Sequence, residues 1–292
     1  MVCCFLINFI FYVELFMLPK ALLKINFMKL KRFKILLVLV IVIYIPFQSM
    51  AWGVLGHRIV GEIAESYLSK KAKREVYKIL GTESIAMTSN WADFIKSNPA
   101  YGYLYNWHFI NVDGGLSEQQ LHAYLEKDTA TDAYTKINFL SSELKNSELP
   151  QEQKLLYLRL LIHLVGDVHQ PLHIGRFKDL GGNKIRVLWF RDSVNLHQVW
   201  DEKLVNFQQL SYTEFTKAIN HTTKAQRKEW QNEPVSTWIY HSYMIAEKIY
   251  ADIKEPHQKL DYKYNYDYLD ILNLQLLKGG VHLAGLLNKI YE

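Results

Sequence analysis

Cysteine is almost absent from this 292-residue chain, and the two cysteines present, Cys3 and Cys4, lie in an apolar opening stretch. The rest of the chain therefore forms no disulfide bonds, and any zinc site in it must use His, Asp and Glu. Internal repeats, low-complexity tracts and linkers are also missing. The composition, 49% hydrophobic and 22% charged, excludes a disordered, collagen-like or coiled-coil protein and is ample for a large core.

Positive charge is concentrated at the beginning of the chain. The net formal charge is +5, but residues 1–51 hold six of the 34 lysines and arginines and one of the 29 acidic residues. Residues 52–292 are therefore formally neutral. A broadly basic surface that attracts nucleic acid or membranes is excluded for this part, so attraction to phosphate must come from bound metal and local lysines.

The opening segment has the pattern of an export signal. Lysines and an arginine at 29–34 precede an apolar run over 35–47, and Ser49-Met50-Ala51 places small residues at both signal-peptidase positions. The run is shorter than the ~20 residues of a membrane-spanning helix. We expect cleavage after Ala51, export to the periplasm or the cell exterior, and no stable membrane association afterwards. An uncleaved anchor helix is the alternative.

Residues 1–27 precede a second methionine, Met28, with which a better-formed signal begins. We interpret them as an upstream start-codon artefact, with a second apolar segment as the alternative. Residues 52–292 form the functional domain in either case.

Helical periodicity dominates residues 52–292. Apolar residues from Ile59 to Leu68 recur at the spacing of one helix face. Ser117 and Gln120 are typical of a capping box. Pro150 suits the first turn of a long helix over the following leucines. Two further helical patterns cover about 234–254 and 266–291.

Departures from helix are few. Gly279-Gly280 can kink or loosen the last helix. Lys184 to Phe190 resembles a strand, and the turn signal Gly181-Gly182-Asn183 precedes it. The loops at 98–116 and 174–196 are the expected irregular parts. The sequence therefore predicts one mostly all-α domain with a small β-ribbon.

Two segments repeat one chemical pattern. His163 and Asp167 are four residues apart, and so are His197 and Asp201. On a helix this spacing places both side chains on one face, about 5–6 Å apart, where they can grip one cation or two neighbouring cations. Apolar neighbours of the first pair indicate burial, and buried ionisable groups need partners or a metal.

Other candidate ligands surround these pairs. Pro171 should end the helix and leave His173 in a loop that can turn back. His169 suits either a metal ligand or a helix-end role. Asp93 and His108 lie in Trp-Ala-Asp-Phe-Ile-Lys and Trp-His-Phe-Ile segments. After cleavage, the free amine and carbonyl of Trp52 can chelate a metal, with His57 near them.

The whole set of motifs, spread over 52–292, resembles the zinc-dependent single-strand-specific nucleases, which include 3′-nucleotidases and are related to bacterial zinc-dependent phospholipase C. The motifs are Trp-Gly…Gly-His, Trp-Ala-Asp-x-Ile-Lys, Trp-His-Phe-Ile, His-x-x-x-Asp-x-His-Gln-Pro-Leu-His, Gly-Gly-Asn and Leu-His-x-x-Trp-Asp. The resemblance implies a single helical domain of the phospholipase C/nuclease type.

The resemblance also implies three Zn²⁺ ions. The first would be held by Asp93, His108, His163 and Asp167. The second would be held by His173, His197 and Asp201. The third would be held by the amine and carbonyl of Trp52, by His57, and by Asp167, which would bridge two ions. Metals in such a cluster activate water and neutralise phosphoryl oxygens.

The resemblance also implies catalytic roles for three further residues. Lys96 matches a cation near the phosphate, although a surface lysine is the alternative. Many members have an acid three residues after the His108 position, whereas this chain has Asn111 there and Asp113 two residues further on. Asn111 can orient a water but cannot take its proton, so either Asp113 substitutes, no such base is needed, or the enzyme is slower.

The predicted function is a secreted, monomeric endonuclease that attacks phosphorus with metal-activated hydroxide. It would cleave single-stranded RNA and DNA to 5′-phosphorylated products, with or without 3′-nucleotidase activity. A phospholipase C-type lipid hydrolase with the same zinc cluster is the alternative. A structural zinc or phosphate-binding protein is disfavoured, because the ligands exceed those of one closed tetrahedral site.

Overall fold

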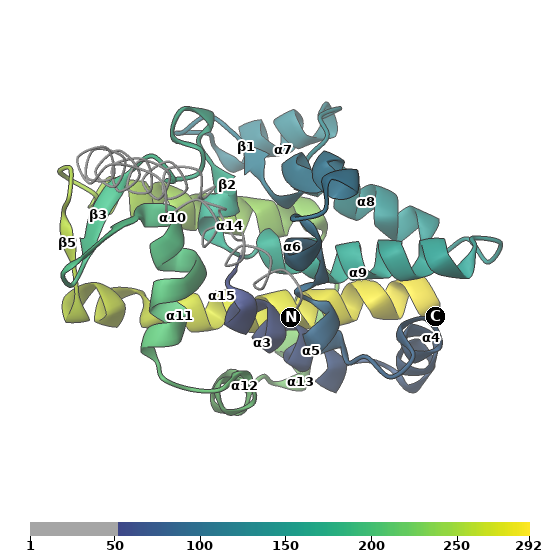
Figure 1. Ribbon diagram of the computed structural model, residues 1–292. Coiled ribbons are helices and arrows are strands. Elements are labelled where there is room, and N and C mark those ends of the chain that lie inside the picture. Colours follow the sequence, from purple (N-terminus) through teal and green to yellow (C-terminus); the bar gives the residue numbers. More distant parts are fainter. Residues whose placement is uncertain (1–51) are drawn as a thin grey trace, which may run out of the picture. The chain divides into compact units, whose positions relative to one another are not determined.

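A computed structural model describes residues 52–292, a mostly helical domain with very small sheets (Figure 1). The α-helices are α3 Val54–Ser66, α4 Lys70–Leu80, α5 Ile85–Thr88, α6 Trp91–Ile95, α7 Glu118–Glu126, α8 Ala133–Glu143, α9 Gln151–Asp167, α10 Leu196–Gln198, α11 Leu204–Phe207, α12 Tyr212–Ile219, α13 Lys224–Trp230, α14 Val235–Asp252 and α15 Tyr262–Tyr291. The predicted fold class is confirmed.

Shorter elements connect these helices. The 3₁₀-helices are η1 Pro99–His108, η2 Pro171–His173 and η3 Phe177–Asp179, and a π-helical turn, η4, covers Val199–Lys203. The strands are β1 Ile110–Asn111, β2 Ile174–Gly175, β3 Arg186–Trp189, β4 Asp192–Asn195 and β5 Lys259–Leu260.

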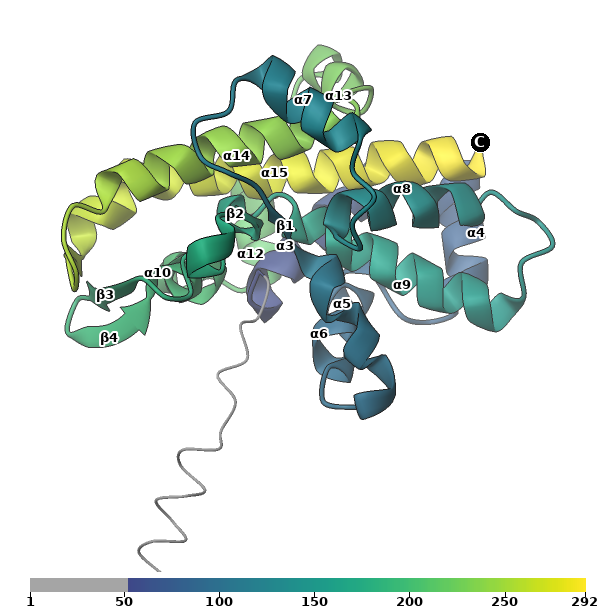
Figure 2. The ribbon, with the colours of Figure 1, turned by 90° about the horizontal axis from the view of Figure 1, so that it is seen from above.

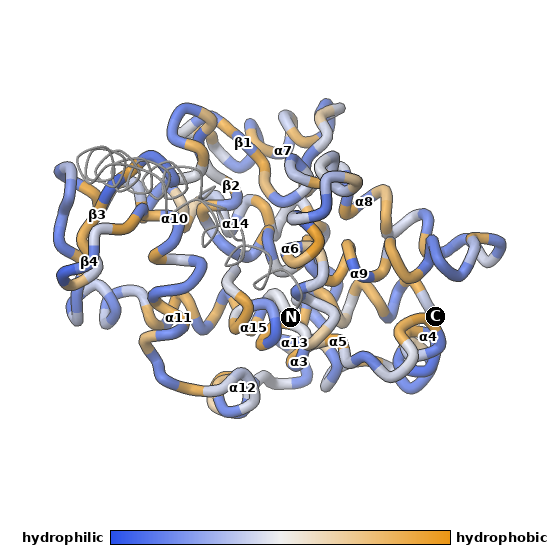
Figure 3. Tube along the Cα trace, viewed as in Figure 1, coloured by the Kyte–Doolittle hydropathy of each residue, from blue (hydrophilic) through white to orange (hydrophobic). Residues whose placement is uncertain are grey.

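The core forms where α3 and α9 pack against the 30-residue helix α15 (Figures 1 and 2). The last turns of α9 are buried all round, and the hydrophobic residues of this helix are visible in Figure 3. Gln275 of α15 ties α14 to the core by donating to the Ser242 hydroxyl, 3.0 Å away.

Helix α15 runs unbroken through Gly279 and Gly280. A Cβ atom at Gly280 would lie 2.4 Å from the Cβ of Ile63 on α3, closer than such atoms approach. The glycine pair therefore allows α3 to cross α15 at short range.

The other predicted elements agree with the structure apart from their ends. Ser117 and Gln120 form the capping box of α7. Pro150 occupies the N-cap of α9, one residue before its first turn. The segment 98–116 is less irregular than expected, because η1 occupies ten of its residues.

Two small sheets organise the remaining segments. β3 pairs antiparallel with β4, as a ribbon should, and also pairs parallel with β5. In the second sheet β1 pairs parallel with β2, with Ile110 opposite Ile174. Because β1 follows η1 and β2 follows η2, this pairing brings the ends of the two 3₁₀-helices, His108 and His173, side by side.

The signal segment and its cleavage point lie outside the described residues. Within residues 52–292, no helix has both the length and the apolar character needed to cross a membrane.

Asp132 gives a stability prediction. Burial, then hydrogen bonding to Asp128, raises its pKa to about 7. The folded state thus binds a proton more tightly than the unfolded chain, and stability falls as pH rises from about 4 to 7. Asp132 also caps α8 by accepting from the Thr135 amide at 3.0 Å.

Asp132→Asn keeps the cap, because Asn is an equally good N-cap residue, and removes the buried charge. We expect the variant to be about 1–2 kcal/mol more stable than the native chain at pH 8 and nearly equal to it at pH 4. Urea unfolding at both pH values measures this. An equal effect at both pH values would contradict the assigned cause.

Candidate metal centre

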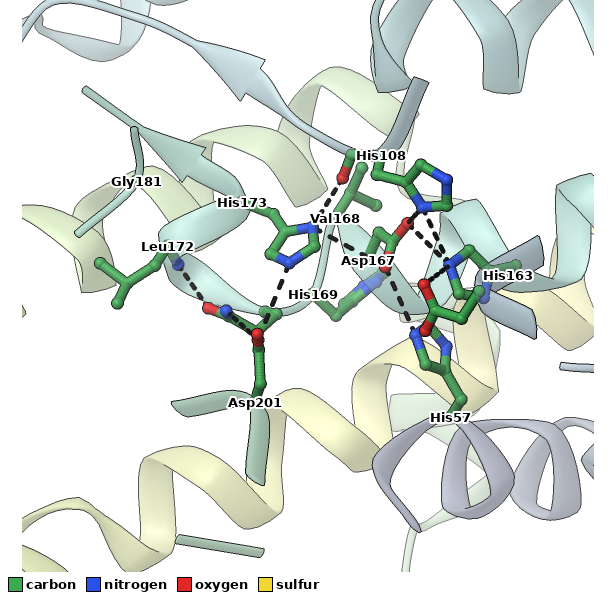
Figure 4. Close-up of polar contacts among 12 residues, drawn as sticks. His57, His108, His163, Asp167, Val168, His169, Leu172, His173, Gly181 and Asp201 are labelled. Atoms are coloured by element: carbon green, nitrogen blue, oxygen red, sulfur yellow. Dashed lines mark hydrogen bonds and ion pairs between the residues drawn. The ribbon is translucent and has the colours of Figure 1, made fainter. Parts of the chain in front are cut away.

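Three groups of buried His and Asp side chains converge between α3, α6, η1, α9, η2 and α10–η4 (Figure 4). In each group the candidate ligand atoms lie within 4.8 Å of one another. The groups are His57 with His163 and Asp167; Asp93 with His108 and His163; and His173 with His197 and Asp201. Eight of the nine predicted metal ligands therefore belong to these groups.

Three of the histidines are fixed in the same way by backbone carbonyl groups. The Nδ1 atom of His163 lies 2.7 Å from the Ser89 oxygen, that of His173 lies 2.6 Å from the His108 oxygen, and that of His197 lies 2.7 Å from the Gly181 oxygen. A carbonyl oxygen only accepts, so each Nδ1 must carry the proton. Each Nε2 is then the nitrogen left to bind either a proton or a metal, the arrangement typical of metal-binding histidines.

Those Nε2 atoms face carboxylates. His163 Nε2 lies 3.2 Å from Asp167 and 3.6 Å from Asp93. His197 Nε2 lies 3.1 Å from Asp201, and His173 Nε2 lies 3.8 Å from the same carboxylate. A lone pair facing a carboxylate is repulsive unless a proton or a metal cation lies between them. The arrangement therefore fits bound cations.

Asp167 is at the centre of the cluster (Figure 4). Its carboxylate lies 3.4 Å from His57, 3.0 Å from His108, 3.2 Å from His163 and 3.7 Å from His173. Burial alone would raise its pKa, but His163 and His173 outweigh burial and hold the pKa well below its usual range. Asp167 thus remains an anion with oxygens directed to both sides.

His57 reaches this carboxylate from α3. Its ring stacks on that of His163 with centroids 4.0 Å apart. Among the described residues neither of its ring nitrogens has a hydrogen-bond partner, although both are buried. Burial, followed by the charge of His163, lowers the pKa of His57, so the neutral form that binds metal is favoured.

Trp52 begins the described chain and is fully buried. The next amide, that of Gly53, donates to the Asp201 carbonyl oxygen at 2.7 Å. Residues 52 and 53 are thereby held between Asp201 and the His57-bearing helix α3, where the family resemblance predicts the third zinc.

The sequence left two roles open for His169, a metal ligand or a helix-end residue. The structure places it at the end of α9. Its Nδ1 donates to the Val165 oxygen at 2.7 Å, and its Nε2 lies 2.6 Å from Nδ1 of His282 on α15. Both nitrogens are therefore engaged away from the three groups.

The predicted catalytic residues lie in different settings. Lys96 is close to the cluster, with its ammonium 2.6 Å from an Asp93 oxygen. Asn111 is in β1 and half-buried, and Asp113 is exposed on the loop that follows. Neither Asn111 nor Asp113 belongs to one of the three groups.

Gln170 is a functional candidate that sequence reasoning missed. Its amide nitrogen donates to Asp201 at 2.5 Å, and its side-chain oxygen accepts from the Leu172 amide at 2.6 Å. Gln170 therefore orients a predicted ligand. Its place directly before Pro171, between two candidate histidines, was the available signal.

A buried set of histidines and carboxylates around shared oxygens is typical of metal-dependent hydrolases. The S1/P1 nuclease family matches residues 52–292, and the chain belongs to this family. The resemblance inferred from the motifs is thus confirmed, and the protein is an endonuclease.

Similar proteins cover nearly the same length. Endonuclease 3 of Arabidopsis thaliana is 29% identical over 266 residues, which are 84% of this chain and 90% of that protein. Nuclease P1 of Penicillium citrinum is 30% identical over 270 residues, which are 82% of this chain and 98% of that protein.

Gly166→Ala should disturb the centre without removing a ligand. An added Cβ atom would lie 2.6 Å from Nδ1 of His57 and must displace that ring. We expect a loss of about 10- to 100-fold in nuclease activity and a lower zinc content. Gly102→Ala is the control, measured like Gly166→Ala on a dinucleotide substrate, because no atom lies within 4 Å of its added Cβ. Equal activity of the two variants would show that the position of His57 is unimportant.

Proposed function

We propose that residues 52–292 form a trinuclear zinc phosphodiesterase that hydrolyses single-stranded RNA and DNA and leaves 5′-phosphates. The observation that carries this proposal is the set of carbonyl-fixed histidines whose Nε2 atoms face Asp93, Asp167 and Asp201. The names of the similar nucleases support the substrate class.

The nine ligands are assigned to three ions as the motifs imply. Asp93, His108, His163 and Asp167 would hold one; His173, His197 and Asp201 would hold another; Trp52, His57 and Asp167 would hold the third. Bound zinc would lower the pKa of a water molecule and neutralise the phosphoryl oxygens. The buried histidines and carboxylates fix the positions of the ions and exclude bulk solvent from them.

Lys96 supplies a positive charge beside the phosphate. Its ammonium pairs with Asp93 and keeps 16% of its side chain exposed, so it can turn toward an incoming anion. Asn111 would orient the attacking water by hydrogen bonding, and Asp113 on the loop that follows would accept its proton, unless the metal-bound water needs no such base. 3′-Nucleotidase activity follows if the site accepts a terminal phosphate.

The leader, the export and the monomeric state belong to the same proposal. Cleavage after Ala51 would create the free amine at Trp52, which the third ion needs. The formally neutral domain would bind nucleic acid with little counterion release, so binding should depend only weakly on salt.

A substrate panel tests the proposal. The mature protein should contain about three zinc ions per chain and cleave RNA and single-stranded DNA in preference to duplex DNA. EDTA should abolish cleavage, and zinc should restore it. Hydrolysis of phosphatidylcholine without cleavage of either nucleic acid would instead favour the lipid hydrolase.

A further inference from the structure

Aromatic side chains form an exposed surface along η1, before the metal centre. We call Tyr101, Tyr103, Phe139 and Tyr157, with Lys136 and Arg159 at their edges, the tyrosine patch. Tyr103 is 54% exposed and Phe139 is 40% exposed. Such large apolar rings are usually covered, so a contiguous exposed group of them indicates a binding surface.

The rings of the patch form two contacting groups, and Lys136 lies over a ring of each. Tyr101 stacks on Tyr103 with centroids 6.4 Å apart, and Tyr103 meets the buried Trp107 edge-on at 5.7 Å. Phe139 of α8 meets Tyr157 of α9 at 5.7 Å. Their neighbours therefore hold the rings in place while much of Tyr103 and Phe139 remains open to solvent.

Two cations accompany the rings. The Lys136 ammonium lies 4.8 Å from the Trp107 ring centre and 5.2 Å from that of Phe139. Within residues 52–292 Lys136 forms these ring contacts and no ion pair. Arg159 lies 5.3 Å from the Trp91 ring and pairs with Glu83 at 2.8 Å. Lys136 in particular is available to an incoming anion.

The patch is continuous with the metal centre, because η1 carries both. This 3₁₀-helix ends at the candidate ligand His108. At about 2 Å per residue, Tyr103 precedes His108 by roughly 10 Å along the helix axis. Trp91, whose ring meets Tyr101 at 5.6 Å, is two residues before Asp93. A chain bound at the metals can therefore extend over the patch.

Building on the proposed function, we propose that the tyrosine patch binds nucleotides of a single strand that lie beyond the cleaved phosphodiester. Exposed rings stack on bases regardless of sequence, at about 1–3 kcal/mol per base. Lys136 neutralises a phosphate between them. Duplex DNA does not offer unstacked bases to these rings, so the patch also favours single strands.

Tyr103→Leu tests the patch, because it keeps an apolar side chain and removes the ring. The holoenzyme should cleave a twelve-nucleotide single-stranded DNA with a KM raised about fivefold or more, which is the lower range of one lost stacking contact. Cleavage of a dinucleotide, which is too short to reach the patch, should be unchanged. Tyr103→Phe should behave like the native enzyme with both substrates.

Tyr266→Leu is the matched control, because Tyr266 on α15 is 82% exposed and outside the patch. Equal changes of Tyr103→Leu on both substrates, or no change on the longer one, would overturn the proposal. If the native enzyme cleaves neither substrate, the proposed nuclease function is wrong, but the patch can still be tested by binding. Fluorescence anisotropy with labelled single-stranded DNA then measures the affinity of the native and Tyr103→Leu proteins. Equal affinities would reject the binding role of the patch.

Discussion

Asp167→Asn is expected to lower the zinc content by two ions per chain and the cleavage of single-stranded DNA by about 1,000-fold or more. The reason is the position of this carboxylate, which lies within 3.7 Å of His57, His108, His163 and His173. An amide of the same size fills the space but offers one neutral oxygen in place of two anionic ones.

Zinc per chain, measured on the purified variant, separates this effect from a catalytic defect. Asp267→Asn is the matched control, because Asp267 is exposed and pairs only with Lys263 on the surface of α15. The control should keep its zinc and its activity. Circular dichroism should show that the Asp167 variant retains its helices. A folded Asp167→Asn protein with full zinc content would contradict the bridging role.

A mature protein with one glycine added before Trp52 should bind one zinc ion fewer than the protein that begins at Trp52. Its activity should be lower by about tenfold or more. An amide nitrogen at this position has no free lone pair, whereas the α-amine of a mature Trp52 has one. The hydrogen bond from Gly53 to the Asp201 oxygen fixes the chain start beside the cluster, so an added residue also needs space there.

Two preparations from one cleavable fusion protein provide the comparison, one beginning at Trp52 and one at Gly-Trp52. An extension after Glu292 is the control and should change neither zinc content nor activity. Equal zinc in both N-terminal forms would remove the amine from the ligand set. Sequencing of exported protein should independently begin Trp-Gly-Val-Leu-Gly-His.

Local patterns predicted much of the fold. The capping residues of α7 and the proline before α9 mark helix starts because they satisfy or remove unpaired amides within one turn. Gly279-Gly280 shows a limit of local patterns, since flexibility is only one reason for glycine in a helix. Another reason is the close approach of Ile63, which lies more than two hundred residues away in the sequence and has no local signal.

In the candidate site, too, local patterns predicted some features, while others depend on residues distant in the sequence. Spacing alone predicted that His163 would meet Asp167 and that His197 would meet Asp201, because four residues span one helical turn. It could not place His173 next to His108, which depends on the pairing of β1 with β2. It also left the role of His169 open, because the partner that decides this role, His282, is on α15.

The crossing of α3 and α15 has a consequence for the order in which the metal centre can assemble. His57 is on α3, and the largest surface that packs against α3 is provided by the 30-residue helix α15. The two helices are separated by about two hundred residues of sequence, so His57 can take its place beside Asp167 only when these distant segments have packed together.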